Sequence, residues 1–568
     1  MKEKLAIAKV GQIIILGVPF ISILVVTGVV TEPVNATKLA ALGTLALPIL
    51  LLLITRARKQ LLSVNLPIVA VSLVFVCASV IAMVASNSPL TQNVYGVYGR
   101  STGFLAYFGF TVFMLGTATL NQVHYFNRIL KGFLFTGVVN VAYCAWVIVF
   151  GDFIGWNNPY KAILGLFGNP NFIGAFLGMF FVATFAVILQ PQLGFKWRLL
   201  GISLLPITFY EILKSRAIQG LVVTAGGLAL VGLLYLWFRK VKTIWIILYS
   251  FAFLVLASTA ILGALQKGPL SFVYKRSVSF RGTYWESGIW MGLHKPFTGV
   301  GMDSYGDWYR RARPPRALVD TPGIETVTNA AHNVFFDLFS YGGFPLLISY
   351  FAILGLGIRS ILRTLRRRTE YDAVFVSIAL VWTCYQIQSI ISINQIGLAI
   401  WGWVFTGALI GYERVTREFT ESESSKSKKL PKLFPKESIS NEAISSNLLA
   451  GIGLALGLII AIPPVSADKK WWDALQSRSV VRIENSLTPS YFNPSNSQKY
   501  AQAVDLFKNN KLPDLALKYS RAAVQFNPED FTSWFQLYGL SNSTAAEKEE
   551  AVKNMKRLDP LNPDVTKP

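Results

Sequence analysis

Residues 333–358 read NVFFDLFSYGGFPLLISYFAILGLGI, an almost uninterrupted apolar stretch. A helix needs about 20 predominantly apolar residues to cross the hydrocarbon core of a bilayer, so this stretch predicts a transmembrane helix. His332, one of three histidines in the chain, stands immediately before it, where a long polar segment ends. A group that titrates near neutral pH at this border can transfer protons or bind a polar substrate, or it can simply cap the helix.

Similar apolar runs occur along the whole chain of 568 residues, of which 53% are hydrophobic and 15% charged. This composition is typical of a membrane protein. We therefore expect an all-α, polytopic membrane protein of about 12–13 transmembrane helices. The predicted spans are residues 9–31, 38–55, 65–85, 103–120, 128–150, 170–190, 197–213, 217–238, 243–265, 333–358, 372–391, 393–412 and 447–465.

The net charge of +23 follows the predicted topology. Basic clusters lie between alternate apolar runs, at residues 56–59, 128–131, 196–198, 239–242, 363–368 and 426–436. If the N-terminus is cytoplasmic, all of these clusters are cytoplasmic too, as the positive-inside rule requires. An odd number of spans then places the C-terminus on the outer side. Because topology explains the positive charge, we expect no nucleic-acid partner.

Composition divides the chain into a membrane part and a polar tail. Residues 1–412 form the predicted polytopic core, which includes a long extracytoplasmic loop at 266–331. Residues 413–446 are rich in Ser, Lys and Glu and are predicted to be a flexible cytoplasmic linker. Residues 447–465 form the last predicted span, and 466–568 form a small extracytoplasmic helical domain.

The tail has the spacing of a tetratricopeptide repeat in one place. Ala516, Ala523 and Pro528 match the small residues and the helix-ending proline of such a repeat, and Trp534 fits the start of the next. The second repeat is out of phase by Pro560. Helical hairpins are expected, either as tetratricopeptide-like repeats or as a small helical bundle.

Four polar features fall on the predicted outer face. They are the glycine-rich segment 96–103 with Arg100, the turn Lys214-Ser215-Arg216, Arg281 with Tyr284 and Trp285, and His332-Asn333. A single outer arginine can serve to anchor the protein to lipid headgroups. Three arginines and a histidine on one face instead suit a diphosphate attached to a lipid, because arginine forms paired hydrogen bonds with phosphate and stays charged.

A second group of basic residues lies within the 266–331 loop. It consists of Arg310, Arg311, Arg313 and Arg316. Such a cluster can attract a polyanionic or phosphorylated substrate.

The sequence predicts neither a metal site nor a cofactor site. Cys77, Cys144 and Cys384 all fall in predicted spans and support neither a disulfide framework nor a cysteine-ligated metal. No His-Glu-x-x-His or Walker motif occurs in the sequence, and Gly299-Val300-Gly301 lacks the strand–turn–helix setting of a dinucleotide site.

Several short motifs occur together in the outer segments. His332-Asn333 is followed by Gly343 after nine intervening residues and then by Pro345. This spacing resembles the His-Asn signature of the O-antigen ligase and polymerase superfamily, from which the chain departs at Leu346, where a small residue or Tyr is usual. Further segments resembling blocks of that family are Gly99-Arg100, Gly168-Asn169-Pro170-Asn171, Ser215-Arg216-Ala217, Arg281 with Tyr284-Trp285, and Pro296 with Gly299-Val300-Gly301.

The resemblance implies a fold like that of GT-C glycosyltransferases in the bacterial cytoplasmic membrane. It implies transfer of an oligosaccharide from an undecaprenyl-diphosphate carrier to an acceptor, without a metal or nucleotide sugar. Arg216 and Arg281 would hold the diphosphate, with help from Arg100, and His332 would position or deprotonate the acceptor hydroxyl. The other residues expected to bind substrate are Ser215, Tyr284 and Asn333. The tail would offer a docking surface for a protein partner.

The sequence leaves the acceptor and one other class of function open. The acceptor can be another lipid-linked unit, a lipid or cell-wall anchor, or a protein hydroxyl, as in a protein O-oligosaccharyltransferase. Polymerisation or ligation of a surface polysaccharide is favoured, since nothing specifies a protein acceptor. A transporter or flippase of lipid-linked glycans is the alternative of a different class, and Glu211, in a predicted span, keeps it open. A scaffold protein that recruits partners through its tail is the third hypothesis.

Overall fold

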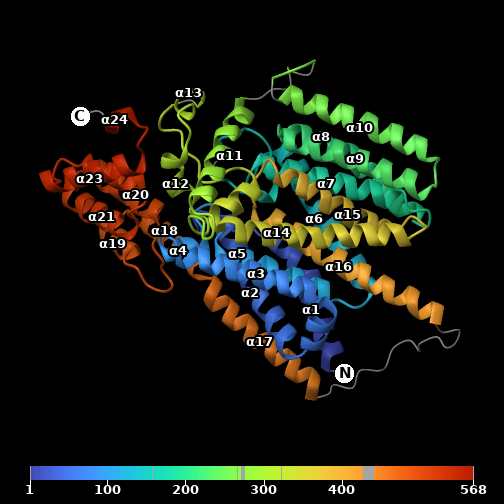
Figure 1. Ribbon diagram of the computed structural model, residues 1–568. Helices are drawn as coiled ribbons and strands as arrows, with labels where there is room; N and C mark the ends of the chain where they lie inside the picture. The colour runs from blue at the N-terminus through green and yellow to red at the C-terminus, as the bar shows by residue number, and fades with distance from the viewer. Residues whose placement is uncertain are drawn as a thin grey trace.

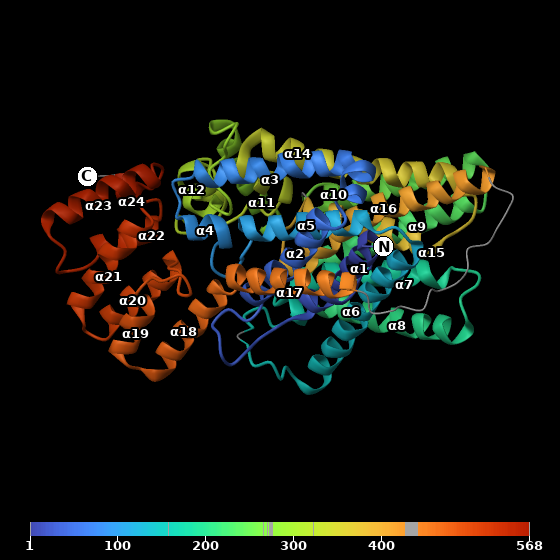
Figure 2. The same ribbon diagram turned by 90° about the horizontal axis from the view of Figure 1, so that it is seen from below.

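The computed structural model describes residues 2–566, apart from residues 157, 265, 270, 272–275, 322 and 426–440. Within these residues all regular structure is helical, and the β-type pairing consists of one isolated bridge between Ser490 and Asn493. An elongated helical bundle carries a smaller helical tail at one end (Figures 1 and 2). The prediction of an all-α protein is confirmed.

Each of the thirteen predicted spans coincides with a helix. These helices are α1 (Lys2–Ile23), α2 (Asn35–Thr55), α3 (Asn65–Val84), α5 (Phe104–Thr119), α6 (Val123–Phe150), α7 (Pro170–Ile188), α8 (Phe195–Lys214), α9 (Ile218–Phe238), α10 (Thr243–Ala264), α14 (Val334–Arg367), α15 (Ala373–Ser389), α16 (Ile396–Ser425) and α17 (Asn441–Ala461). In the described part of the chain, nine helices are long and apolar enough to cross a membrane. The number of candidate spans rises to ten if α17 and α18, which meet at a 48° bend, are counted together as one span.

The difference from the predicted 12–13 spans comes from three short or polar helices. With 16 and 17 residues, α5 and α15 are apolar but short. The third, α8, begins with Lys196 and Arg198 and ends at Lys214, so its apolar part is shorter than the helix itself. These three still pack into the bundle, against α16, α7 and α9.

The segment 266–331, predicted as a long extracytoplasmic loop, includes helices that its polar sequence did not indicate. It contains α11 (Arg276–His294), α12 (Tyr305–Ala312) and α13 (Ala317–Asp320). Mean hydropathy hides α11 because its buried residues, among them Thr283, Ser287 and Met291, recur only once per helical turn. On the same helix Gly292 lets α14 approach closely, since a Cβ there would lie 2.5 Å from the Phe339 ring.

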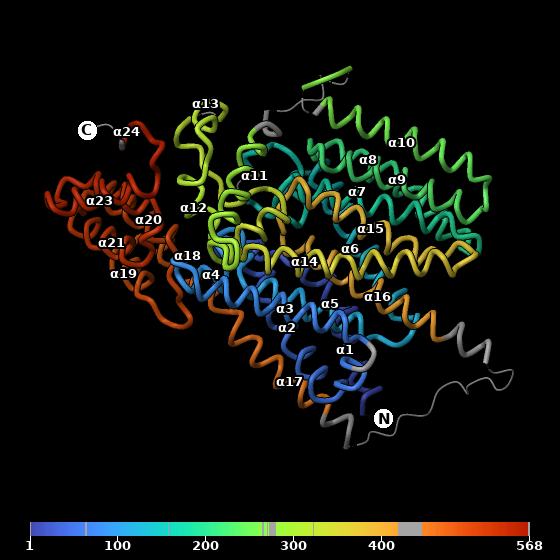
Figure 3. Tube along the Cα trace, viewed as in Figure 1, coloured from blue at the N-terminus to red at the C-terminus, as the bar shows by residue number. Residues whose placement is uncertain are grey.

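A break in α14 explains the glycine that follows His332-Asn333 in the sequence motif. Gly343 has φ 63 and ψ −156, and a Cβ there would lie 2.2 Å from the carbonyl oxygen of Pro296. The Phe344 N–H donates to that same oxygen at 2.7 Å, and the Val300 N–H donates to the Ser340 carbonyl at 2.8 Å. The segment after α11 is therefore hydrogen-bonded to the broken turn of α14, and Figure 3 shows α11 and α14 next to each other.

The tail forms its own helical unit. It consists of α18 (Pro463–Ser477), α19 (Val480–Leu487), α20 (Ser497–Asn509), α21 (Pro513–Phe526), α22 (Phe531–Tyr538), α23 (Ala545–Leu558) and α24 (Pro563–Thr566). The pairs α20/α21 and α22/α23 pack as hairpins around a core that includes Ala516, Ala523 and Trp534. The helical character is confirmed, and the tetratricopeptide assignment stays a prediction.

Helices occupy both ends of the predicted linker at 413–446. The chain continues as α16 to Ser425 and resumes as α17 at Asn441. Residues 426–440, the centre of that linker, lie outside the described residues.

Candidate functional site

A cavity of about 340 Å³ lies at the end of the bundle nearer the tail. Its wall brings together three of the sequence blocks singled out above, at Gly99-Arg100, Gly168-Asn169 and His332. The lining residues are Glu32, Val34, Asn35, Gly99, Arg100, Tyr160, Phe167, Gly168, Asn169, Asn171, Phe172, Gln219, His332, Ser392, Ile393, Asn394 and Gln395. Most of these residues are polar, which suits a hydrophilic ligand at a membrane surface.

Arg100 sits on a loop whose shape is fixed by one buried carboxylate. Asp303 accepts hydrogen bonds from the Val97 N–H at 2.8 Å, from the Thr102 hydroxyl at 3.1 Å and from the Tyr341 hydroxyl at 3.1 Å. A Cβ at Gly96 would lie 2.4 Å from the Thr102 nitrogen, so only glycine closes this loop. Burial raises the pKa of Asp303, and Arg100 acts against that rise.

His332 is held in an unusual backbone conformation by its neighbours. Its φ is 56, in the left-handed region, which costs a non-glycine residue about 1–2 kcal/mol. The Ala331 N–H donates to Asp337 at 2.6 Å. On the other side, Asn333 accepts from the N–H groups of Phe335 and Phe336 at 3.0 and 3.2 Å and so caps α14. Such strain, held in place from both sides, is often found at functional sites.

Its surroundings favour the neutral imidazole of His332. Burial lowers the pKa of His332 to about 3, and the nearby Arg100 and Arg281 act in the same direction. The Tyr284 ring lies 5.8 Å from the imidazole, centroid to centroid. A neutral imidazole offers one N–H donor and one nitrogen lone pair.

Two of the three predicted arginines lie close to His332 and form no salt bridge among the described residues. Arg281 lies near the start of α11, one turn before Tyr284, and burial lowers its pKa. Among the residues that the structure describes, neither Arg100 nor Arg281 forms an ion pair. Asp303 and Asp337 balance part of the Arg100 charge, yet both guanidinium groups keep donors outside any salt bridge, which suits an anion beside a neutral histidine.

The third arginine, Arg216, lies in the turn between α8 and α9 and is exposed. It is not among the residues that line the cavity, whereas Gln219, one turn further along, is. Ser215 is buried in the same turn, where its hydroxyl donates to the Ile212 carbonyl at 2.6 Å and packs against Gly174. The structure thus brings Arg100, Arg281, Tyr284 and His332 together and places the Ser-Arg turn at their side.

The cavity also contains a set of amide side chains that the sequence motifs did not predict. Gln395 donates to Asn35 at 3.0 Å, and Asn35 donates to the Gly99 carbonyl at 2.8 Å, next to Arg100. Asn394 accepts from the Tyr385 hydroxyl at 2.5 Å. Residues 393–412 were predicted as a span, but α16 begins only at Ile396. Two adjacent amides at the edge of an apolar run were the signal that could have revealed this part of the site.

The loop arginines are not available to a polyanionic substrate, which corrects that prediction. Arg310 and Arg313 bind Asp559 of the tail at 3.0 and 2.7 Å, and Arg311 binds Glu529. Arg316 pairs with Glu286 at 2.5 Å. Carboxylates of the tail and of α11 therefore pair with this cluster, and Arg310, Arg311 and Arg313 join the segment to the tail.

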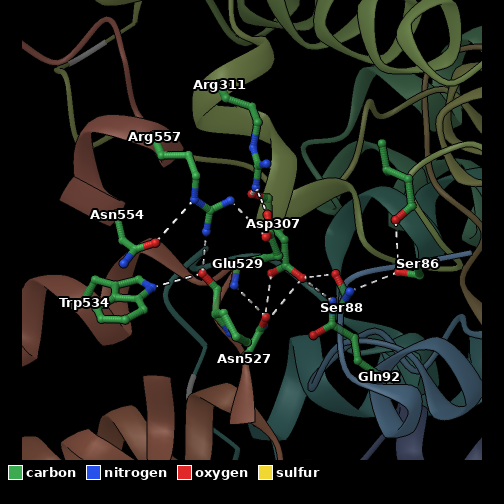
Figure 4. A network of polar contacts seen from close by, with 12 residues as sticks. Ser86, Ser88, Gln92, Asp307, Arg311, Asn527, Glu529, Trp534, Asn554 and Arg557 are labelled. Atoms are coloured by element: carbon green, nitrogen blue, oxygen red, sulfur yellow. Dashed lines mark hydrogen bonds and ion pairs between the residues drawn. The ribbon is translucent and has the colours of Figure 1, made fainter. Parts of the chain in front are cut away.

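Figure 4 shows the polar network at this junction. Asp307, on α12 one turn before Arg310 and Arg311, accepts from Ser88 at 2.5 Å, from Gln92 at 2.9 Å and from Asn527 of the tail at 3.5 Å. Arg557 of the tail joins it through Glu529, at 2.9 Å. The tail is thereby connected both to α12 and to α4 (Leu90–Tyr95), which precedes the Arg100 loop.

Comparison with known proteins identifies one domain. Residues 201–351 match the family described as O-antigen ligase, a segment that begins in α8, ends in α14 and contains Arg216, Arg281 and His332. No curated protein matches the chain. The match supports the O-antigen ligase and polymerase superfamily, and with the apolar helices it indicates a multi-pass membrane protein with a glycan-transferring role in surface polysaccharide assembly.

Proposed function

From the O-antigen ligase domain at residues 201–351, we propose a glycosyltransferase that uses a lipid-diphosphate-linked oligosaccharide as donor. The carrier is undecaprenyl diphosphate, and the acceptor belongs to surface polysaccharide assembly. The observation that carries this proposal is the position of Arg100 and Arg281, which form no salt bridge in the described structure, beside His332; Arg100 and His332 line the polar cavity. We expect the reaction to need neither a metal nor a cofactor.

The arginines bind the diphosphate and stabilise it as it leaves. As the bond between the sugar anomeric carbon and the diphosphate oxygen breaks, negative charge grows on that oxygen. Arg281 and Arg100 lie where their fixed charges favour this change, and a preorganised donor is worth about 100-fold or more in rate. Arg216, which is exposed beside the cavity, binds either the diphosphate or the headgroups of the surrounding lipids.

His332 acts on the acceptor hydroxyl. Its neutral imidazole accepts a hydrogen bond from the hydroxyl while the oxygen attacks the anomeric carbon. A bound diphosphate offsets the charges of Arg100 and Arg281, and this raises the pKa of His332. The imidazole can then take the proton as the new glycosidic bond forms, and later pass it to solvent or to the departing diphosphate.

We place the cavity on the extracytoplasmic side of a bacterial cytoplasmic membrane. In support, the cavity lies at the end of the bundle where the Gly168 and His332 segments meet, and the basic clusters at 56–59, 239–242 and 363–368 lie between the opposite ends of the helices. The N-terminus is then cytoplasmic and the tail extracytoplasmic. The acceptor is a glycan, a lipid or a protein hydroxyl, with polysaccharide ligation or polymerisation preferred.

One observation favours the transporter alternative. Glu211 of α8 is 1% exposed, and neither of its carboxylate oxygens has a hydrogen-bond partner in the described structure. A buried carboxyl group in a span is a common feature of transport pathways. Movement of the lipid-linked glycan from one leaflet to the other in protein-containing vesicles, without any glycan transfer, would favour this function.

The direct test is an in vitro transfer assay with the purified full-length protein, a lipid-diphosphate oligosaccharide and an acceptor, with a chelator present. We expect product from the wild type, and loss of it in His332→Ala and in Arg281→Gln. Arg316→Gln is the matched control, since it removes an arginine from an exposed ion pair with Glu286. Normal transfer by both site variants would contradict the proposal.

A further inference from the structure

A second cavity, of about 120 Å³, lies between α3, α14 and α16. Its lining residues are Asn65, Pro67, Ile68, Leu356, Arg359, Ser360, Arg363, Ile410, Glu413, Arg414 and Arg417. These residues belong to the first turns of α3 and to late turns of α14 and α16. His332 precedes the first turn of α14, so the two cavities lie at opposite ends of the bundle.

Two of the lining arginines stand one helical turn apart without a counter-ion. Arg359 and Arg363 are exposed on α14, and within the described ranges neither forms an ion pair or a side-chain hydrogen bond. Like charges at this spacing destabilise a helix. Glu413, the acidic residue in the cavity wall, is already bound by Arg367 at 3.2 Å and by Arg417 at 3.4 Å.

A third arginine reaches the cavity from a buried position. Arg414 is 4% exposed, and its Nη2 donates to the Leu120 carbonyl at 2.6 Å. Its Nε and Nη1 atoms are buried and have no partner in the described structure. Buried charged donors without a hydrogen-bond acceptor destabilise a protein, so an anion bound in this cavity would be stabilising.

The surroundings of the cavity match a lipid rather than a free ion. Pro67, Ile68 and Ile410 form its apolar wall. Large apolar side chains are exposed directly beside it, namely Leu66, Ile358 and Leu362. Acyl chains can lie along these side chains while the headgroup meets the arginines.

We propose that this cavity binds the phosphate group of an anionic phospholipid from the leaflet at that end of the bundle. Arg359 and Arg363 contact the phosphate from α14, and Arg414 donates to it from α16. Arginine suits this role because its planar donors match phosphate oxygens, and basic pockets between membrane helices commonly hold acidic headgroups. The inference is independent of the glycan-transfer proposal, since no residue of the His332 cavity takes part.

The test compares lipid binding by full-length variants in a zwitterionic detergent. Phosphatidylglycerol is titrated against the protein, and bound lipid is followed by native mass spectrometry, with phosphatidylcholine as the neutral probe. We expect the wild type to prefer phosphatidylglycerol. The double variant Arg359→Gln with Arg363→Gln should bind this lipid at least about tenfold more weakly. Arg366→Gln, an exposed position on the same helix that does not line the cavity, keeps wild-type affinity.

A single variant at Arg414 gives a second reading. Arg414→Gln also weakens phosphatidylglycerol binding, and the exposed pair at Arg359 and Arg363 keeps the test decisive if Arg414→Gln fails to fold. Equal loss in the Arg366→Gln control, or equal binding of phosphatidylcholine, would overturn the proposal. Inorganic phosphate that displaces the lipid at equal concentration would show a free-anion site and overturn the assignment to a lipid.

Discussion

Two groups of arginines lie at the same end of this molecule, and among the described residues only one of them forms salt bridges. Arg310, Arg311 and Arg313 on and after α12 are bound by carboxylates of the tail, and Arg313 is 1% exposed against an Asp559 that is fully buried. Arg100 and Arg281 beside His332 form no ion pair among the described residues. The first group holds the structure together, and the second leaves positive charge for a ligand. Arginine content alone therefore does not distinguish the two groups, whereas the presence or absence of a salt bridge does.

The largest effect should come from breaking the docking group. Asp559→Asn leaves the buried Arg313 guanidinium without its charge partner and leaves Arg310 with the exposed Glu325 alone, which costs about 3–5 kcal/mol of tail docking or folding. Limited proteolysis and thermal unfolding of the full-length protein measure this loss. Lys469→Ala, which breaks an exposed pair with Asp473, should change neither. A fully stable Asp559→Asn protein with a protected tail would show that these pairs do not dock it.

Arg281→Gln should lower glycan transfer by about 100-fold without lowering the thermal unfolding temperature. The side chain has no ion pair to lose in the described structure, so its removal leaves the fold intact. Arg316→Gln serves as the control, with transfer within about twofold of the wild type. An Arg281→Gln protein that loses stability along with activity would place Arg281 in the docking group instead.

The pKa of His332 should report the charges around it. In the wild-type protein without substrate it lies far below 6.5, so the imidazole is neutral throughout the range from pH 5 to 8. Arg281→Gln removes one repelling charge and should raise the pKa of His332, although burial keeps it below that of an exposed histidine. Histidine-selective NMR titration measures this, with His332→Ala to assign the signal among three histidines. An unchanged midpoint would mean that Arg281 does not act on the imidazole.

The smallest effect concerns Asn333, which the sequence singled out as a substrate-binding residue. Its side chain accepts from two N–H groups of α14, so Asn333→Ala should cost about 1 kcal/mol of stability and shift His332 next to it. Asn333→Ser restores a capping oxygen and should recover both stability and activity. Thermal unfolding measures the stability of each variant, and a glycan-transfer assay measures its activity. If Asn333→Ser is stable yet inactive, the amide contacts the substrate directly.

The helices of the core could be predicted because apolar runs of sufficient length have few other structures open to them in a membrane. The helix α11 could not, since its buried residues alternate with polar ones within a segment of low hydropathy. Of the site, His332, Arg100 and Arg281 were found from short motifs. The geometry adds the role of Asp303, which fixes the Arg100 loop from 206 residues away.

The contrast between the two arginine groups could not be predicted from the sequence either, because it too depends on residues far apart in the chain. Arg313 and its partner Asp559 are separated by 246 residues, and only docking of the tail brings them together. Read locally, the loop arginines are a stronger basic cluster than Arg100 or Arg281. Their neutralisation is a tertiary effect that no local pattern contains.

The most direct test of the account is equilibrium binding of a polyprenyl diphosphate to the full-length protein in detergent. Arg100→Gln combined with Arg281→Gln should weaken this binding about 100-fold, because two charged contacts to the diphosphate are lost. Arg311→Gln, which removes a cation already bound to Glu529, should leave the affinity unchanged. Wild-type affinity in the double variant, with binding lost in Arg311→Gln, would contradict the account.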